Sequence, residues 1–345
     1  MNNPLEQTLL NITRASAITK TEVIQSLWSG YGDIARYKVQ QGCSEAVVVK
    51  HVKLPDQNDP SKPSHPRGWN TDLSHQRKIK SYDVESHWYK HFSGQCDDDC
   101  RVPKCHGVHV TDNECLMVLE DLDSSGFSVR KTKASIADMQ LCLKWLAHFH
   151  VKFLTTSSDN EAAADNTKYK KALWPVGCYW HLDTRPDELA ALQDQPLKTA
   201  AHTLDELLKA CPYQTLVHGD AKLANFCFAD NGKQVAAVDF QYVGTGIGMK
   251  DVAYFIGSCF DGRGCEQYAE SLLDDYFKYL HAAMAQKNSV MDAVLVEAAW
   301  RPLFVVAWAD FHRFLKGWSP EHWKIHDFSE RITKHALQLL ARKNA

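Results

Sequence analysis

Polar residues interrupt two apolar runs in the segment LVHGDAKLANFCF, residues 216–228. Asp220 supplies a carboxylate, Asn225 supplies a carboxamide, and Lys222 lies between them in the sequence. A positioned carboxylate can take a proton from a reacting hydroxyl group. Carboxylate and carboxamide oxygens are also ligands that Mg²⁺ prefers in proteins. The segment therefore has the residue types needed for proton transfer beside a bound metal ion.

The elements around this segment predict a third oxygen-bearing side chain at the same place. TLVH, NFCF and QVAAVDF each have the pattern of a short strand, and Asn231-Gly232 is a strong hairpin signal between the last two. Asn225 and Asp239 lie seven residues on either side of Gly232, so closure of the hairpin brings them together at its open end. We expect these two residues to hold Mg²⁺ while Asp220, in the loop beside them, acts as the base.

This spacing matches the pattern of phosphoryl transfer. An Asp followed five residues later by Asn matches the kinase catalytic loop, and an Asp-Phe pair after the next hairpin matches the metal-binding element of kinases. A kinase also needs a strand lysine for the α and β phosphates of ATP and a helical glutamate that orients it. Lys50 ends the apolar run AVVVK and Glu85 lies in the helical pattern DVESHWY, although Lys53 is close enough to compete with Lys50.

Further motifs surround these residues: MVLEDL at 117–122, HGD at 218–220, VDFQ at 238–241 and KDVAYFIG at 250–257. Together they resemble the aminoglycoside phosphotransferase and choline kinase superfamily. Asp-Phe-Gln and the MVLEDL segment resemble its ecdysteroid-kinase-like branch. The resemblance covers about residues 30–255 and implies a two-lobed protein-kinase-like fold.

The resemblance also implies roles for individual residues. The backbone of Glu120, Asp121 and Leu122 would receive adenine. Lys222 replaces the histidine common in aminoglycoside kinases and could neutralise charge on the transferring phosphoryl group. The glycine loop, SGYGDIARY, offers only Gly30 and Gly32.

The order of predicted elements agrees with this fold. The first third is mostly strands with one helix over residues 81–92, and residues 54–72 read as a loop or insertion. From Ser135, which forms a capping-box pattern with Asp138, most segments are helical. We therefore expect an α+β protein with a small antiparallel-sheet lobe carrying one helix and a larger, mainly helical lobe. The predicted domains are a nucleotide-binding lobe, 1–122, and a catalytic and substrate-binding lobe, 123–345.

Composition excludes several partner classes. With a formal net charge of −3 and a pI near 6.6, the chain gives no reason to expect nucleic acid or an acidic membrane surface. No apolar run reaches the roughly 18 residues of a membrane span, and the first residues do not resemble a secretory signal. Eleven scattered cysteines favour reduced thiols, so we expect a cytoplasmic protein.

Three local patterns are expected to have structural and not catalytic roles. Zinc could in principle bind at Cys96, Cys100, Cys105 and His106, but the spacing is not that of a zinc knuckle, so we expect packing. His218 is expected to brace the loop that holds Asp220. GTGIG at 244–248 follows Asp-Phe without a βαβ unit, so we expect a flexible activation segment rather than a dinucleotide loop.

These observations predict an ATP- and Mg²⁺-dependent kinase that phosphorylates a hydroxyl group of a small molecule. A nucleotide-binding pseudokinase scaffold is the alternative, although a scaffold needs none of Asp220, Asn225 and Asp239. A protein kinase is disfavoured because no APE-like anchor follows Asp239. A choline or ethanolamine kinase remains open as the specific variant. Aromatic residues of the last third could line a pocket for a quaternary ammonium or for an apolar alcohol, and the sequence does not decide between them.

Overall fold

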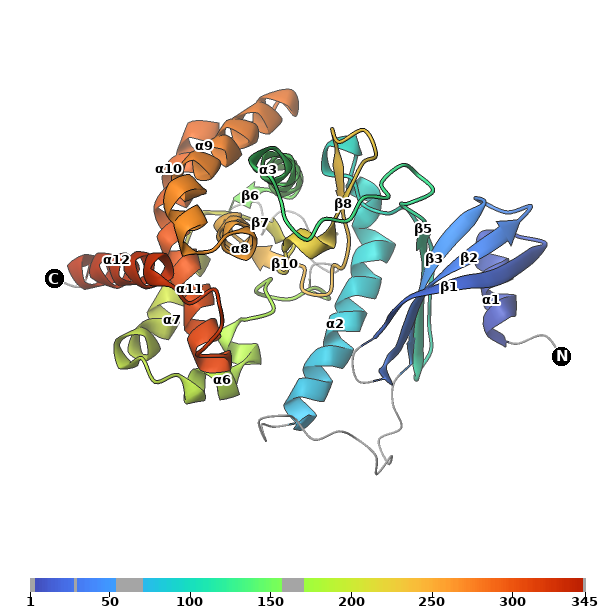
Figure 1. Ribbon diagram of the computed structural model, residues 1–345, viewed down its shortest axis with the longest axis horizontal. Coiled ribbons are helices and arrows are strands. Elements are labelled where there is room, and N and C mark those ends of the chain that lie inside the picture. Colours follow the sequence, from blue (N-terminus) through green and yellow to red (C-terminus); the bar gives the residue numbers. More distant parts are fainter. Residues whose placement is uncertain (1–3, 28–29, 54–70, 157–170, 344–345) are drawn as a thin grey trace. The chain divides into compact units, whose positions relative to one another are not determined.

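The computed structural model describes four stretches of the chain, residues 4–27, 30–53, 71–156 and 171–343 (Figure 1). The chain forms two compact units. Unit 1 comprises Met1–Val129 and Cys227–Val238, and unit 2 comprises Arg130–Phe226 and Asp239–Ala345. The division predicted from the sequence treats each domain as one stretch of chain, whereas unit 1 takes in a later hairpin. The assignment of nucleotide binding and catalysis to separate domains stays a prediction.

Unit 1 is built on a five-stranded antiparallel sheet in the order β1-β2-β3-β5-β4. Helix α1 precedes the sheet and helix α2 separates β3 from β4, with two short 3-10 turns after α2. The prediction of a strand-rich first third is confirmed, whereas α1, β1 and β2 were not individually predicted. The elements are α1 Pro4–Thr13, β1 Ala17–Ser26, β2 Gly32–Gln40, β3 Ala46–Lys53, α2 Thr71–His91, η2 Ser93–Gln95, η3 Asp98–Cys100, β4 Cys105–Val110 and β5 Glu114–Glu120.

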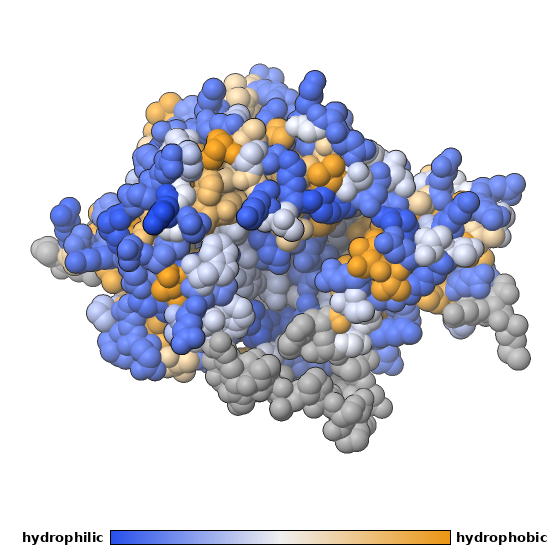
Figure 2. All heavy atoms as spheres, viewed as in Figure 1, coloured by the Kyte–Doolittle hydropathy of each residue, from blue (hydrophilic) through white to orange (hydrophobic). Residues whose placement is uncertain are grey.

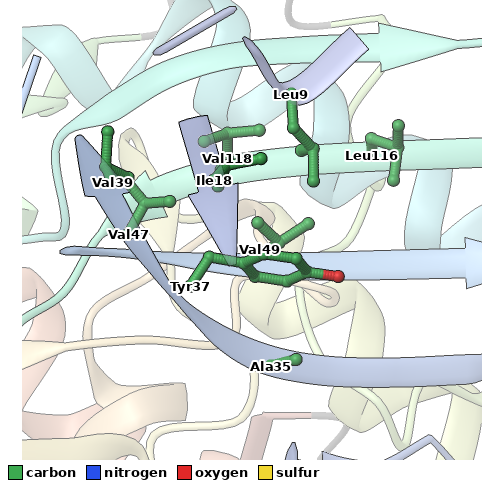
Figure 3. Close-up of a cluster of buried hydrophobic side chains, with 9 residues drawn as sticks. All are labelled: Leu9, Ile18, Ala35, Tyr37, Val39, Val47, Val49, Leu116 and Val118. Atoms are coloured by element: carbon green, nitrogen blue, oxygen red, sulfur yellow. The ribbon is translucent and has the colours of Figure 1, made fainter. Parts of the chain in front are cut away.

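The two faces of this sheet carry different chemistry because side chains alternate along a strand. Val47 and Val49 of β3 point into the apolar core, where Leu9 of α1 also packs (Figure 3). Burying each such aliphatic side chain contributes about 1.5–3 kcal/mol. Lys50 belongs to the opposite face, on which Glu85 of α2 lies. The full core cluster is Leu9, Ile18, Ala35, Tyr37, Val39, Val47, Val49, Leu116 and Val118.

The predicted hairpin around Gly232 is confirmed. Strands β8, Phe226–Phe228, and β9, Val235–Ala237, pair with each other, and Gly232 takes the positive φ of +67° that the turn requires. The N–H of Gly232 donates to the Ala229 carbonyl at 2.8 Å. The hairpin therefore ends in two residues, Asn225 and Asp239, that the sequence analysis selected as metal ligands.

Unit 2 is mainly helical. Its first helix, α3, begins with the predicted capping box of Ser135 and Asp138, and Met139, Leu143 and Leu146 on one face of this helix are buried. A small sheet in the order β10-β7-β6 lies among the helices. The elements are α3 Ile136–Lys152, β6 Thr155–Thr156, η4 Leu182–Thr184, α6 Pro186–Ala191, α7 Gln195–Lys209, β7 Tyr213–Val217, η5 Leu223–Asn225, β10 Gly244–Gly246, α8 Met249–Cys259, α9 Gly262–Gln286, α10 Ala293–Trp300, η6 Arg301–Leu303, α11 Phe304–Trp318 and α12 Asp327–Lys343.

These two units together give the predicted α+β, protein-kinase-like architecture, with one correction. The GTGIG segment is not a flexible activation segment, because Gly244–Gly246 forms β10 and pairs with β7. A Cβ at position 244 would lie 2.2 Å from the carbonyl oxygen of Trp174. Glycine is therefore needed there for close backbone packing and not for flexibility. The predicted insertion at 54–72 lies outside the described residues except for its last two, which begin α2.

The described stretches contain neither a membrane-spanning helix nor a group of three metal-ligating His, Cys, Asp or Glu side chains. Over these residues no helix is both long and apolar enough to cross a bilayer, and no three His, Cys, Asp or Glu side chains are grouped to hold a metal ion. Burial raises the pKa of Cys105 to about 11. The face shown in Figure 2 is mostly hydrophilic, with apolar residues scattered over it.

Candidate active site

A buried carboxylate holds the backbone of the loop that carries Asp220. This loop follows β7. Gly219 in the loop has a φ of +78°, and a Cβ there would lie 2.2 Å from the Tyr242 carbonyl oxygen. Asp251 of α8 accepts the backbone N–H of His218 at 2.6 Å with Oδ2 and that of Gly219 at 2.9 Å with Oδ1. The turn therefore depends on both a glycine and a remote aspartate.

Asp251 is in turn positioned by two residues of the helical core. His150 of α3 bonds to Asp251 Oδ2 through Nε2 at 3.1 Å, and its Nδ1 lies 2.8 Å from the Tyr276 hydroxyl on α9. All three side chains are buried. Helices α3, α8 and α9 thus fix the backbone that leads to Asp220.

The carboxylate of Asp220 is surrounded by donors. Oδ2 accepts hydrogen bonds from Lys222 Nζ at 2.7 Å and from Asn225 Nδ2 at 3.2 Å. Oδ1 accepts the Tyr254 hydroxyl at 3.0 Å. Asp220 is only 7% exposed, and this burial raises its pKa above the ordinary value although Lys222 acts in the opposite direction. A raised pKa makes this carboxylate a stronger base at neutral pH.

Asn225 and Asp239 place oxygen atoms beside Asp220. Asn225 Nδ2 donates to the Asp220 backbone carbonyl at 2.8 Å and also to the Asp220 carboxylate. The Oδ1 atom of Asn225 accepts no hydrogen bond from the described residues. Asp239 has a φ of +68°, rare for a residue with a side chain, and accepts Gln241 Nε2 at 2.6 Å. Burial and, to a smaller extent, the charge of Asp239 raise the pKa of Asp220. Asn225 and Asp239 flank the β8–β9 hairpin and Asn225 bonds to Asp220, so the hairpin and this hydrogen bond bring the three predicted residues together.

Unit 1 brings Lys50 and Glu85 together. Lys50 Nζ donates to Glu85 Oε2 at 2.5 Å, and the two residues are only 4% and 1% exposed. Lys53 is exposed at the end of β3, so the structure favours Lys50 over its sequence competitor. Lys50 lies within β3 and not at its end, because the strand continues to Lys53.

The predicted adenine segment, Glu120 to Leu122, uses its side chains for structure. Glu120 accepts Arg101 Nη2 at 2.5 Å and the Lys104 N–H at 2.9 Å; burial raises its pKa, but these donors outweigh it and the net pKa is lowered. Asp121 accepts Arg36 Nε at 2.8 Å. The N–H groups of Asp121 and Leu122 bond to no other described residue, so the backbone of this segment retains donors for a ligand.

The glycines of the predicted phosphate loop have the conformations that favour glycine. Gly30 and Gly32 have φ values of +77° and +117°. A Cβ at position 32 would lie 2.0 Å from the His51 carbonyl oxygen, whereas position 30 has open space around it. Ser29 of this loop lies outside the described residues.

Sequence reasoning missed three residues at the site, Asp251, Tyr254 and Gln241, and found one structural role correctly. His218 braces the loop as expected, because its Nδ1 accepts the Asp220 N–H at 3.3 Å. Asp251 and Tyr254 stand three residues apart in KDVAYFIG, so they share a helix face. That spacing was the signal available for them.

Residues 77–289, more than half of the chain, match the model of the ecdysteroid kinase-like family. The chain belongs to this family. A search of curated proteins finds no match. The family assignment agrees with the resemblance inferred from the motifs.

Several solved structures of kinases are distantly similar to this ecdysteroid kinase-like chain. One is the amicoumacin kinase hAmiN in complex with AMP-PNP, Ca²⁺ and Ami, with 12% identity over 98% of this chain and 93% of that one and a TM-score of 0.46. A microcompartment-associated aminopropanol kinase has 14% identity over 96% and 93%, with a TM-score of 0.48. An ethanolamine kinase of Plasmodium vivax has 11% identity over 95% and 84%, with a TM-score of 0.48. At this distance none of them identifies an acceptor for this chain.

Proposed function

We propose that this chain is an ATP- and Mg²⁺-dependent kinase that transfers the γ-phosphoryl group to a hydroxyl group of a small molecule. The observation that carries the proposal is the buried Asp220 carboxylate, held by Lys222, Asn225 and Tyr254, with a second carboxylate, Asp239, at the other end of the β8–β9 hairpin that follows Asn225. A purely structural aspartate would not need a loop held this firmly with a second carboxylate beside it. Enzymes arrange such groups where a proton must be moved.

In the proposed reaction, the acceptor oxygen bonds to the γ-phosphorus while the bond from that phosphorus to the β,γ-bridging oxygen breaks and ADP leaves. Asp220 takes the hydroxyl proton. Lys222 neutralises charge on the transferring group, and its side chain is 39% exposed, so it remains reachable. Positioning and charge stabilisation dominate catalysis in this reaction class.

Asn225 and Asp239 fit a Mg²⁺ ion because both side chains offer an oxygen ligand and neither offers a thiolate. The unbonded Oδ1 of Asn225 is suited to this role. When bound, Mg²⁺ neutralises charge on the β and γ phosphates. Lys50, oriented by Glu85, would hold the α and β phosphates, and the backbone of Glu120 to Leu122 would receive adenine.

The location proposed for this reaction is the cytoplasm. All eleven cysteines are free thiols, which favours a reducing compartment. The proposed partners are ATP and a small hydroxyl compound, without nucleic acid or membrane.

Transfer of ³²P from γ-labelled ATP to a panel of hydroxyl compounds tests the proposal. The panel includes choline, ethanolamine, sterols and hydroxy acids, and Asp220→Asn serves as the low-activity control. We expect Mg²⁺-dependent labelling of one class by the wild-type chain, and labelling slower by about 10² to 10⁴ in Asp220→Asn. Tight binding of Mg²⁺ and ATP without transfer to any compound and without ATP hydrolysis would support the scaffold alternative instead.

A further inference from the structure

Lys324 lies in the segment between α11 and α12 and is surrounded by aromatic rings. Its Nζ is 5.0 Å from the ring centre of Tyr254, 5.6 Å from that of Phe311 and 5.5 Å from that of Trp323. These distances are within the range of cation–π attraction. The protein's own ammonium therefore faces the aromatic groups that a quaternary ammonium ligand would need.

This ammonium has no oxygen partner among the described residues, although other lysines of unit 2 with little exposure do. Lys250 is paired with Asp310 at 3.1 Å, and Lys316 is paired with Asp194 at 2.8 Å. Lys324 makes neither an ion pair nor a side-chain hydrogen bond within those residues, and burial lowers its pKa to about 8. Lys324 is half-buried, and the three donors of its ammonium have no acceptor among the described residues. Such a group is suited to receive an oxygen ligand.

Tyr254 connects Lys324 to the proposed base. Its ring lies beside the Lys324 ammonium while its hydroxyl donates to Asp220 Oδ1 at 3.0 Å. The charges of Asp220 and Lys222 both act on the pKa of Lys324, in opposite directions. An acceptor whose hydroxyl approaches Asp220 would therefore extend within reach of two lysine ammonium groups.

We propose that Lys324 is a specificity-determining residue of the acceptor site, where its ammonium binds an anionic oxygen group, such as a carboxylate, of the molecule that is phosphorylated. This inference rests on the proposed function and names its substrate class. A choline-like acceptor would meet the like charges of Lys222 and Lys324, and the aromatic rings beside Lys324 already face a cation. A hydroxylated anion pairs the free ammonium and packs its carbon skeleton on the rings.

Three probes with one shared skeleton test this inference: 4-(hydroxymethyl)benzoate, 4-(hydroxymethyl)benzamide and 4-(hydroxymethyl)benzyltrimethylammonium. Their affinities for the full chain with Mg²⁺ and AMP-PNP are measured by calorimetry. We expect the benzoate to bind about tenfold more tightly than the amide, because hydrogen bonds between charged groups are the stronger ones. The ammonium compound should bind most weakly. Benzoate binding no tighter than amide binding overturns the inference.

Variants assign the preference to Lys324. In Lys324→Gln the benzoate-to-amide ratio of affinities should fall to about one, whereas Lys324→Arg should keep most of it because the charge remains. Lys334→Gln, at an exposed lysine of α12, makes the same charge change and should leave the ratio as in the wild type. The ratio is measured within one variant, so it does not depend on the fraction of that variant that is folded. An unchanged ratio in Lys324→Gln also overturns the inference.

The two proposals fail in different ways. If the benzoate preference depends on Lys324 but no hydroxyl compound receives phosphate, the anion site stands and the kinase function fails. If choline or a similar cation is phosphorylated most efficiently and Lys324→Gln leaves its kcat/KM unchanged, the kinase function stands and the inference about Lys324 fails.

Discussion

The carboxylate of Asp251 holds the backbone of His218, which lies 33 residues earlier in the chain, through a hydrogen bond of 2.6 Å. The same carboxylate accepts the Gly219 N–H. Asp251→Asn replaces one accepting oxygen with an NH₂ group that cannot accept. We expect the free energy of unfolding to fall by about 2–4 kcal/mol, since hydrogen bonds to a buried charged group are involved. Urea unfolding measures this, and Glu270→Gln, at an exposed carboxylate of α9, should change it by less than about 0.5 kcal/mol.

Asp220→Asn should separate proton transfer from nucleotide binding. The variant keeps the shape of the side chain and removes the base, so turnover should fall by about 10² to 10⁴. Affinity for ATP with Mg²⁺ should stay within a few-fold, because Asn225, Asp239 and Lys50 are unchanged. Steady-state kinetics and calorimetry provide the two numbers. Loss of ATP binding in a folded Asp220→Asn protein would instead make Asp220 a metal ligand.

Asp239→Ala should remove the effect of Mg²⁺ on ATP affinity. The oxygen donors at Asn225 and Asp239 include only one carboxylate, so its loss leaves a single neutral ligand for the ion. Titration of the wild type and of Asp239→Ala with ATP, with and without Mg²⁺, checks this by calorimetry. Equal ATP affinity with and without Mg²⁺ in the wild type would count against the proposed metal site.

Lys50 and Lys53 provide a matched pair on one strand. Lys50→Met leaves Glu85 buried without its cation, so the free energy of unfolding should fall by about 3–5 kcal/mol and AMP-PNP binding should be lost. Lys53→Met, at an exposed site, should change neither by much. The double variant Lys50→Met with Glu85→Gln removes both charges and should regain most of the stability without regaining nucleotide binding. Nucleotide binding by this stable double variant would show that Lys50 is only structural.

His312 should make the stability of unit 2 depend on pH. Burial lowers its pKa to about 3, so between pH 6.5 and 3 the unfolded chain binds a proton that the folded chain does not. Stability is therefore lost as the pH falls, by about 2 kcal/mol from this group between pH 7 and 5. His312→Asn should reduce that loss by a similar amount, whereas His335→Asn, at an exposed position of α12, should not. Urea unfolding at the two pH values measures the difference.

Local patterns were enough to predict the hairpin at whose ends two candidate site residues lie, because the hairpin brings its own ends together. Asn225 and Asp239 follow from the turn at Gly232, and Asp220 from its spacing to Asn225. Tertiary packing could not be read in the same way. Lys324 is 70 residues beyond Tyr254, and nothing near it in the sequence indicates that their side chains meet.

The errors in the fold prediction have the same origin. Strand β1 is exposed along most of its length, so it lacks the alternating apolar pattern that identifies a half-buried strand. The glycines of 244–248 suggest flexibility when read locally, but Gly244 and Gly246 pair with β7 and pack closely against Trp174 and Val217. Local signals therefore predicted the hairpin, whose pairing is between neighbouring segments of the chain. They failed for β1 and β10, whose assignment as strands depends on contacts with other segments.

Strand β10 has a consequence for how turnover would be controlled. Thr245 lies in its centre, opposite Leu216 of β7, and its N–H donates to the Trp174 carbonyl. The backbone of this segment is therefore paired with β7 and bonded to Trp174 without any modification. We expect the proposed reaction to need no phosphorylation of Thr245 to order this segment, so its rate should follow the supply of ATP and acceptor.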